Sequence, residues 1–241
     1  MKKITTIFFL FSFFSVFAQQ KITFPSLDGL PITADVYYKE ANSPLIILCH
    51  QARFSRAEYK DIAKELNNMG FNCIAIDQRS GARIFGVVNE TNRHALEENH
   101  NTDYLDAEQD IVAAVDYASK KYKQKVILWG SSYSASLALK IGKNNEQVKA
   151  IVAFSPGEYF GEKLILKNAI KNLNKPAFIT SSKEEAPDVT VLISEIKNTV
   201  TQFIPQWEGT HGSKALWREI KGNEEYWEAV KKFLDRDDVK N

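Results

Sequence analysis

A serine flanked by small residues stands where an apolar run meets a helix-like segment. Ser132 is the middle residue of the pentapeptide Gly-Ser-Ser-Tyr-Ser at 130–134, between the apolar run 126–129 and residues with helical spacing. A strand that turns sharply into a helix through Gly-x-Ser-x-small presents its serine as a nucleophile, and the helix N-terminus offers N–H groups to an oxyanion. Ser132 is therefore the candidate nucleophile. The alternative is a serine-rich loop that only caps a helix.

Acidic residues and a histidine follow later strand-like runs, in an order that suits nucleophilic catalysis. Glu184 and Glu185 follow the run 176–180, and His211 lies in the loop after the run 201–204. An imidazole in a short loop bordered by glycines can act as a general base, and a carboxylate can orient it. His211 is therefore the predicted base, with the acid still to be chosen from the residues after 180.

These residues need a scaffold, and the apolar pattern predicts one. The chain alternates short apolar runs with amphipathic segments, which is typical of a mostly parallel sheet with helices on both faces. An antiparallel hairpin is expected first, at 22–38, and a long polar loop at 78–102. The expected strands are 44–50, 71–77, 126–129, 148–154, 176–180 and 201–205, and the expected helices are 55–68, 103–122, 189–198 and 224–234.

With these features the chain resembles an α/β-hydrolase of the dienelactone-hydrolase-like or small carboxylesterase kind. The pentapeptide at 130–134, the acidic residues after a strand and the late His-Gly at 211–212 carry the resemblance, which runs from residue 22 to the last helix. It implies the α/β-hydrolase fold with a minimal cap, because the insert between 154 and 176 is short. It also implies a Ser-acid-His triad in that chain order.

The resemblance assigns further roles. Counted from the proline that opens the strand at 176, the acid falls on Glu185, with Glu184 and Asp188 as alternatives. The oxyanion hole would use the backbone N–H of Tyr133. Its second donor would follow His50, on Gln51 or Ala52, although this sequence departs there from the family's His-Gly-x-Gly. His50 itself would be structural.

Side chains near the strand ends could select the substrate. Arg79 and Arg53 could hold a substrate carboxylate or phosphate, with pairing to loop carboxylates as the alternative. Trp207 could line the pocket, as could Phe85, Tyr159 and Phe160.

Two cysteines and four histidines show no zinc-ligand spacing, so neither a metal nor another cofactor is predicted. Cys49 and Cys73 lie near opposite ends of two strand-like runs. If those strands are parallel neighbours, the thiols lie at different heights and form no disulfide.

The first residues have the features of a signal peptide. Lys2 and Lys3 precede the apolar stretch 4–17, and Ala18 ends a small-residue cleavage site. We therefore expect a signal at 1–18 and a single mature domain at 19–241. The mature protein would be exported, to a periplasm or outside the cell, without membrane attachment after cleavage.

Composition limits the partners. The 241 residues carry a formal net charge of +1, which gives no reason to expect nucleic-acid binding, and no feature specifies an oligomer. The sequence therefore predicts a secreted serine hydrolase acting on carboxylic esters of small or acylated polar molecules. The alternatives are a peptidase of the same fold and a non-catalytic binding protein on a hydrolase scaffold.

Overall fold

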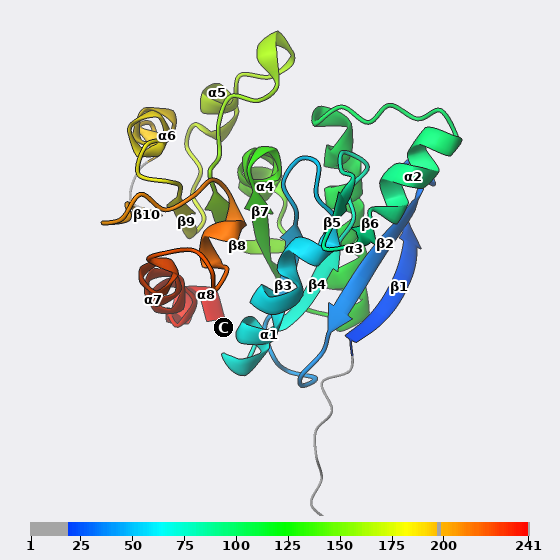
Figure 1. Cartoon of the computed structure of the whole chain (residues 1–241), viewed down its shortest axis with the longest axis horizontal. Helices are drawn as coiled ribbons and strands as arrows, with labels where there is room; N and C mark the ends of the chain where they lie inside the picture. The colour runs from blue at the N-terminus through cyan, green and yellow to red at the C-terminus, as the bar shows by residue number, and fades with distance from the viewer. Residues whose placement is uncertain (1–18, 197–198, 241) are drawn as a thin grey trace, which may run out of the picture.

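The computed structural model describes residues 19–196 and 199–240, and it contains one eight-stranded sheet (Figure 1). The spatial order is β1-β2-β4-β3-β7-β8-β9-β10. Neighbouring strands from β4 to β10 run parallel, whereas β2 is antiparallel to β1 and β4. The strands are β1 (Gln19–Pro25), β2 (Pro31–Tyr37), β3 (Leu45–Cys49), β4 (Asn72–Ile76), β7 (Val126–Ser131), β8 (Val148–Phe154), β9 (Ala177–Thr180) and β10 (Val200–Phe203).

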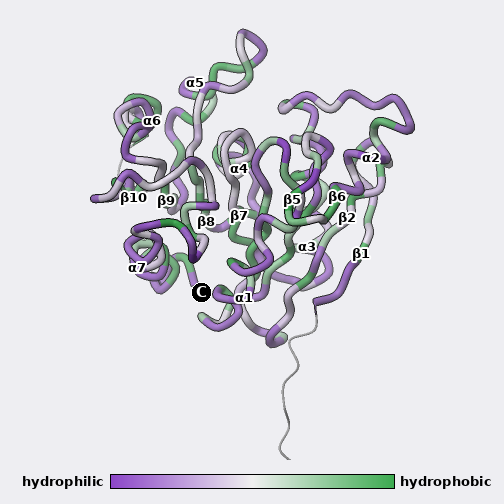
Figure 2. Tube along the Cα trace, viewed as in Figure 1, coloured by the Kyte–Doolittle hydropathy of each residue, from purple (hydrophilic) through white to green (hydrophobic). Residues whose placement is uncertain are grey.

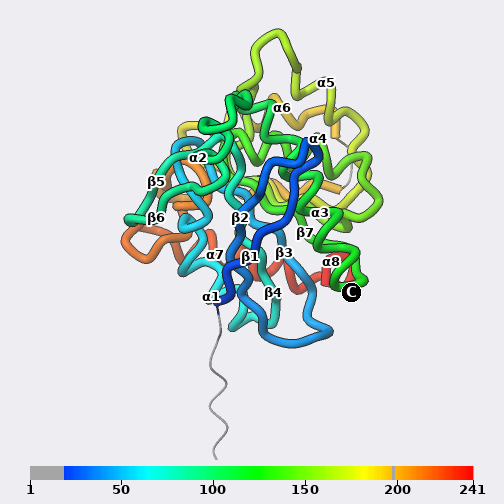
Figure 3. Tube along the Cα trace, turned by 90° about the vertical axis from the view of Figure 1, so that its right-hand side faces the viewer, coloured from blue at the N-terminus to red at the C-terminus, as the bar shows by residue number. Residues whose placement is uncertain are grey.

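Helices cover both faces of this sheet. One apolar cluster packs one face against α3 (Glu108–Tyr122), α4 (Tyr133–Asn144), α5 (Leu166–Ile170) and α6 (Ala186–Ile193). A second cluster packs the other face against α1 (Lys60–Asn68), α7 (Asn223–Leu234) and α8 (Asp237–Lys240). The predicted α/β architecture with an N-terminal hairpin is confirmed, and the hairpin lies along one edge of the sheet (Figure 3).

The central strands form because their apolar runs are buried on both faces. Every residue of β3, β4 and β7 is buried, and the hydrophobic colouring concentrates in the middle of the molecule (Figure 2). Parallel strands end at the same edge of a sheet, so the loops after β3, β7, β8 and β9 meet there. That edge lies at the top of Figure 1.

The prediction of a long polar loop at 78–102 is wrong in part. It contains a small hairpin of β5 (Arg83–Ile84) and β6 (Val87–Val88), followed by α2 (Glu90–Glu97). Asn89 caps the helix by accepting the N–H of Asn92 at 2.7 Å. Because α2 buries only Thr91 and Ala95, it lacks the apolar stripe that would have predicted a helix from the sequence.

Smaller differences concern helix boundaries. The segment expected to be helical from 55 opens with the 3₁₀ turn η1 (Arg56–Tyr59) before α1. The helix expected at 189–198 starts earlier, at Ala186, with a proline in its first turn, and ends at Ile193; positions 197–198 lie outside the described residues. α8 was not predicted. The other 3₁₀ turns are η2 (Leu105–Ala107), η3 (Gly161–Lys163) and η4 (Ser213–Leu216).

The two cysteines are buried and unpaired, as expected. In the parallel pair β3–β4, Cys49 lies opposite Ile76, whereas Cys73 lies opposite Ile46. The expected signal peptide at 1–18 lies outside the described residues. In the described part of the chain, no helix has the length and apolar character needed to cross a membrane.

Candidate active site

Ser132 stands at a strained turn between β7 and α4. Its φ of 61° and ψ of −126° are unusual for a residue with a side chain, and its N–H donates to the carbonyl of Phe154 at 2.8 Å. A Cβ on Gly130 would collide with the backbone of Ser134, so only glycine allows β7 and α4 to approach this closely. The local geometry is that of a nucleophile elbow.

Ser134 occupies the fifth elbow position, where the motif usually has glycine. Its hydroxyl accepts the N–H of Ser131 at 2.9 Å and donates to the carbonyl of Cys49 at 2.7 Å. The side chain therefore joins the elbow to the end of β3, which explains how serine is accommodated at this position.

Glu185 is the carboxylate that binds His211. One carboxylate oxygen pairs with Nδ1 of His211, and the other accepts the hydroxyl of Ser155 at 2.7 Å and the N–H of Ser182 at 3.1 Å. Burial alone would raise the pKa of Glu185, but the hydrogen bonds from His211 and Ser155 outweigh it and hold the pKa at about 2. Glu184 and Asp188 are exposed.

The loop that carries His211 is attached directly to the elbow. The N–H of Gly212 donates to the hydroxyl of Ser155 at 2.9 Å, and the N–H of Ser213 donates to the hydroxyl of Ser131 at 2.8 Å. Because Nδ1 of His211 is bound by Glu185, Nε2 is the nitrogen that can take a proton from a serine. The structure thus brings the loops of Ser132, Glu185 and His211 together.

Ser155 is a site residue that was not predicted from the sequence. It follows β8 with φ of 55°, and its hydroxyl holds both Glu185 and the base loop. A polar residue at a parallel strand end, directly before Pro-Gly, was the signal available in the sequence.

The turn after His50 selects one of the two predicted oxyanion donors. The N–H of Gln51 donates to Oε2 of Glu58 at 2.7 Å, so Gln51 is not free to bind an oxyanion, contrary to that prediction. The carbonyl of Gln51 accepts Nδ1–H of His50 at 2.8 Å. In a trans peptide N–H and C=O point in opposite directions, so the N–H of Ala52 is directed away from His50. Ala52 and Tyr133, the first residue of α4, remain as the candidate donors.

His50 is a buried neutral residue. Its Nε2 accepts the N–H of Gln78 at 3.1 Å, and burial lowers its pKa to about 4. The Gln78 side chain also binds the His50 backbone: it accepts the N–H of His50 at 3.2 Å and donates to the carbonyl of His50 at 3.1 Å. These contacts fit the structural role expected of His50.

A cavity of about 280 Å³ lies beside the elbow. The ring of Tyr104 stacks on that of Tyr133 at 4.6 Å, and the hydroxyl of Tyr159 faces Ser132 while donating to the carbonyl of Ser155 at 2.9 Å. Of the expected pocket walls, Tyr159 and Phe160 line this cavity. Its lining residues are Thr102, Asp103, Tyr104, Leu105, Tyr159, Phe160 and Lys163.

Arg79 is not available to a substrate, so that prediction is wrong. Its side chain is buried and pairs with Asp110 at 2.7 Å and Asp28 at 2.8 Å. A buried cation must be compensated, and here two carboxylates use its donors. The alternative prediction, that this arginine pairs with carboxylates, is correct, but the partners Asp28 and Asp110 are identified only by the tertiary structure.

Arg53 and Trp207 occupy different surroundings. Arg53 is exposed, with φ of 66°, in the turn that carries Ala52. The indole of Trp207 is half exposed, and Nζ of Lys221 lies 3.7 Å from the ring centroid. Neither Trp207 nor Phe85 lines the cavity beside the elbow, and Phe85 packs on Trp217 with ring centroids 5.1 Å apart. Within 19–196 and 199–240, no three His, Cys, Asp or Glu residues form a group suited to a metal ion.

Known proteins share this architecture. A family model described as "Serine aminopeptidase, S33" matches residues 40–183, a span that contains the elbow but ends before Glu185 and His211. The chain is 26% identical over 141 residues to the thiohydrolase apmlB of Arthrinium phaeospermum, covering 57% of this chain and 43% of that protein. The chain thus spans less than half the length of this relative.

Solved structures agree on the fold. The Pyrococcus furiosus esterase Pf2001 has a TM-score of 0.70 at 17% identity, covering 90% of this chain and 92% of that one. A dienelactone hydrolase from Anabaena variabilis has a TM-score of 0.69 at 14% identity, covering 90% of this chain and 96% of that one.

Proposed function

Because this chain belongs to the serine aminopeptidase S33 family of α/β-hydrolases, we propose that it is a serine hydrolase that cleaves carboxylic esters of small or acylated polar molecules. The observation that carries the proposal is the pairing of ionised Glu185 with His211 on a loop attached to the elbow of Ser132. The esterase and dienelactone hydrolase among the structural neighbours are consistent with it.

The proposed mechanism follows from these contacts. His211 Nε2 takes the proton of Ser132 as its Oγ attacks the ester carbonyl, and Glu185 stabilises the imidazolium. The N–H groups of Tyr133 and Ala52 hold the oxyanion, each contributing about 3 kcal/mol. Collapse releases the alcohol, which takes the proton from His211. Water activated by the same histidine then hydrolyses the acyl-enzyme and releases the acid.

The cavity beside the elbow suits a compact acyl or aryl group, because Tyr104, Tyr159 and Phe160 form its walls. The relative described as a thiohydrolase extends the proposal to thioesters, whose carbonyl carbon can be attacked in the same way. The family description favours a peptidase as the second candidate. A peptide α-amine would require a carboxylate, but Asp103 at this cavity is paired with Lys163 at 3.1 Å.

Labelling with a fluorophosphonate probe tests the proposal. Wild-type protein is expected to be labelled at one serine, whereas Ser132→Ala and His211→Ala lose the label because the nucleophile or its base is missing. Ser194→Ala, at the exposed end of α6, is the matched control and keeps the label. Folded wild type that stays unlabelled would contradict the proposal and favour a binding protein. A panel of p-nitrophenyl esters, an acyl thioester and aminoacyl p-nitroanilides then separates esterase from peptidase.

We also propose that the mature protein is exported to a periplasm or outside the cell, on the basis of the charged and apolar residues before Gln19. Intact-mass measurement of protein recovered from the extracytoplasmic fraction is expected to show a chain that begins at Gln19. An uncleaved N-terminus, or recovery only with the cytoplasm, would contradict this.

A further inference from the structure

Glu58 is a buried acid that the proposed mechanism does not use. Only 1% of the residue is exposed. Its Oε2 accepts the N–H of Gln51 at 2.7 Å, and its Oε1 accepts the hydroxyl of Ser131 at 2.8 Å. The same Ser131 oxygen receives the N–H of Ser213 from the base loop at 2.8 Å. One carboxylate therefore connects the oxyanion turn, the elbow and, through Ser131, the loop of His211.

The segment around Glu58 is held on both sides. Arg56 bonds Asp77 at 2.7 Å and lies 3.1 Å from Asp35, and both carboxylates are buried. The hydroxyl of Tyr59 donates to the carbonyl of Cys49 at 2.8 Å. The 3₁₀ turn is therefore well placed to hold the carboxylate of Glu58 steadily against the two loops that it contacts.

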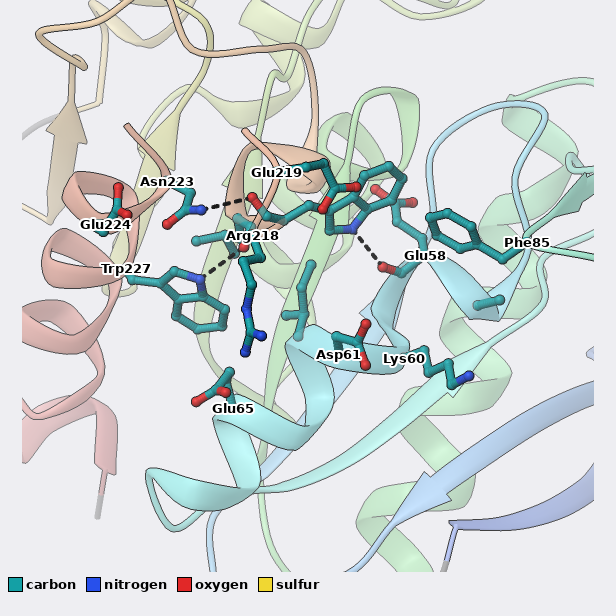
Figure 4. Close-up of a pocket in the computed structure, with 14 residues that line it drawn as sticks. Glu58, Lys60, Asp61, Glu65, Phe85, Arg218, Glu219, Asn223, Glu224 and Trp227 are labelled. Carbon is teal, nitrogen blue, oxygen red and sulfur yellow. Dashed lines mark hydrogen bonds between the residues drawn. The ribbon is translucent and has the colours of Figure 1, made fainter. Parts of the chain in front are cut away.

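Figure 4 shows the outer side of this arrangement. A cleft of about 790 Å³ lies beside α1 and α7, and Glu58 is one of its lining residues. The indole N–H of Trp217 donates to the Glu58 carbonyl at 3.1 Å, which is one of the dashed lines in the figure. Glu58 lines this cleft and its carboxylate contacts Gln51 and Ser131, whereas neither Ser132 nor His211 lines the cleft.

We propose that Glu58 is a positioning residue whose ionised carboxylate orients the oxyanion turn and the elbow for the hydrolysis by Ser132. This rests on the function proposed above. With the Gln51 N–H bound by Glu58 and its carbonyl bound by His50, both peptides of the turn are oriented, and the N–H of Ala52 is left for the oxyanion. Hydrogen bonds to an ionised acceptor are stronger than neutral ones.

The surroundings of Glu58 shift its pKa so that the carboxyl group changes charge near neutral pH. Burial raises the pKa of Glu58 to about 7, against the lowering effects of the Gln51 N–H, the Ser131 hydroxyl and the charge of Lys214 on η4. Burial also raises the pKa of Tyr59 and of Cys49, so both neighbours stay neutral. Below pH 7 Glu58 gains a proton, its bond to Ser131 must reverse, and activity is expected to fall.

The test compares wild type with Glu58→Gln, which keeps the shape and one acceptor oxygen but replaces the other oxygen with a donor amide and carries no charge. We expect kcat to fall about 10- to 100-fold with KM within about threefold. The acidic limb of log kcat against pH should be steeper in wild type than in Glu58→Gln by about one unit of slope, because only wild type has the additional ionisation of Glu58. Glu65→Gln, in the same cleft but exposed, is the matched control.

Measurements of folding stability show whether Glu58 positions the catalytic loops or only contributes to packing. A raised carboxyl pKa favours the protonated folded state, so folding stability decreases as pH rises from about 4.5 to about 7. Glu58→Gln lacks this penalty, and its Tm at pH 8 should equal or exceed that of wild type. Ser131→Ala, which removes the donor to Oε1, is the second variant and should lower kcat about fivefold.

The outcomes are distinct. If the probe labels wild type, but Glu58→Gln has the same kcat and the same acidic limb of log kcat against pH as wild type, the role of Glu58 is overturned and the proposed function is not. An unlabelled wild type would overturn the proposed function, and the role of Glu58 with it. If Glu58→Gln fails to fold, an unchanged kcat in Ser131→Ala would overturn the proposal instead.

Discussion

Glu185→Gln is expected to lower kcat about 10,000-fold, whereas Glu184→Gln should stay within about twofold of wild type. The carboxylate of Glu185 accepts Nδ1–H of His211 and so leaves Nε2 free to take a proton. A glutamine at 185 can donate to Nδ1, which favours the tautomer with its proton on Nε2. That tautomer cannot act as a base toward Ser132. Glu184 is exposed and is the matched control, one residue away.

The measurement is kcat for an activated ester at pH 8, with active sites counted by probe labelling. The control pair separates local charge from the catalytic contact, since each variant removes one negative charge from the same turn. Equal losses in the two variants, or a larger loss in Glu184→Gln, would contradict the assignment of Glu185.

Arg79→Ala is expected to lower the free energy of unfolding by about 3–5 kcal/mol. Removing the guanidinium leaves Asp110, whose side chain is fully buried, without its cation. The hydroxyl of Ser26 at 2.7 Å and the backbone N–H of residue 79 at 2.8 Å would remain as its donors. The pair also ties α3 to the end of β4 and to the turn of the β1–β2 hairpin through Asp28, so local order should be lost as well.

Chemical denaturation at pH 7 measures this effect. Arg93→Ala removes an exposed pair with Glu97 at 2.9 Å and should cost at most about 0.5 kcal/mol. The double variant Arg79→Met with Asp110→Leu should recover part of the loss, because no buried charge remains unpaired. A loss under about 1 kcal/mol in Arg79→Ala would contradict the importance of this ion pair.

Much of this architecture could be predicted from the sequence because its strands are continuous apolar runs. The elbow was recognisable for a related reason, since a strand, a tight turn and a helix are all local features. Whether Gln51 or Ala52 donates to the oxyanion could not be predicted from the local sequence. It depends on Glu58 and His50, which bind the two peptides of the turn from different directions.

Glu58 itself could not be recognised from its neighbours. It lies in a segment with the spacing of an amphipathic helix, where an acidic residue normally faces solvent. Its burial depends on the 3₁₀ turn that precedes α1 and on Ser131, which is 73 residues away along the chain. Arg79 was misassigned for the same reason, because Asp110 lies on a helix 31 residues later.

Cys49 and Cys73 have a consequence for how this chain reaches its native state. Both thiols are buried, burial raises the pKa of each, and the β3–β4 register keeps them from meeting. The reactive thiolate is therefore scarce and inaccessible in the folded protein. Folding needs no oxidant and no disulfide isomerase, so the same native structure can form whether the surrounding compartment is reducing or oxidising.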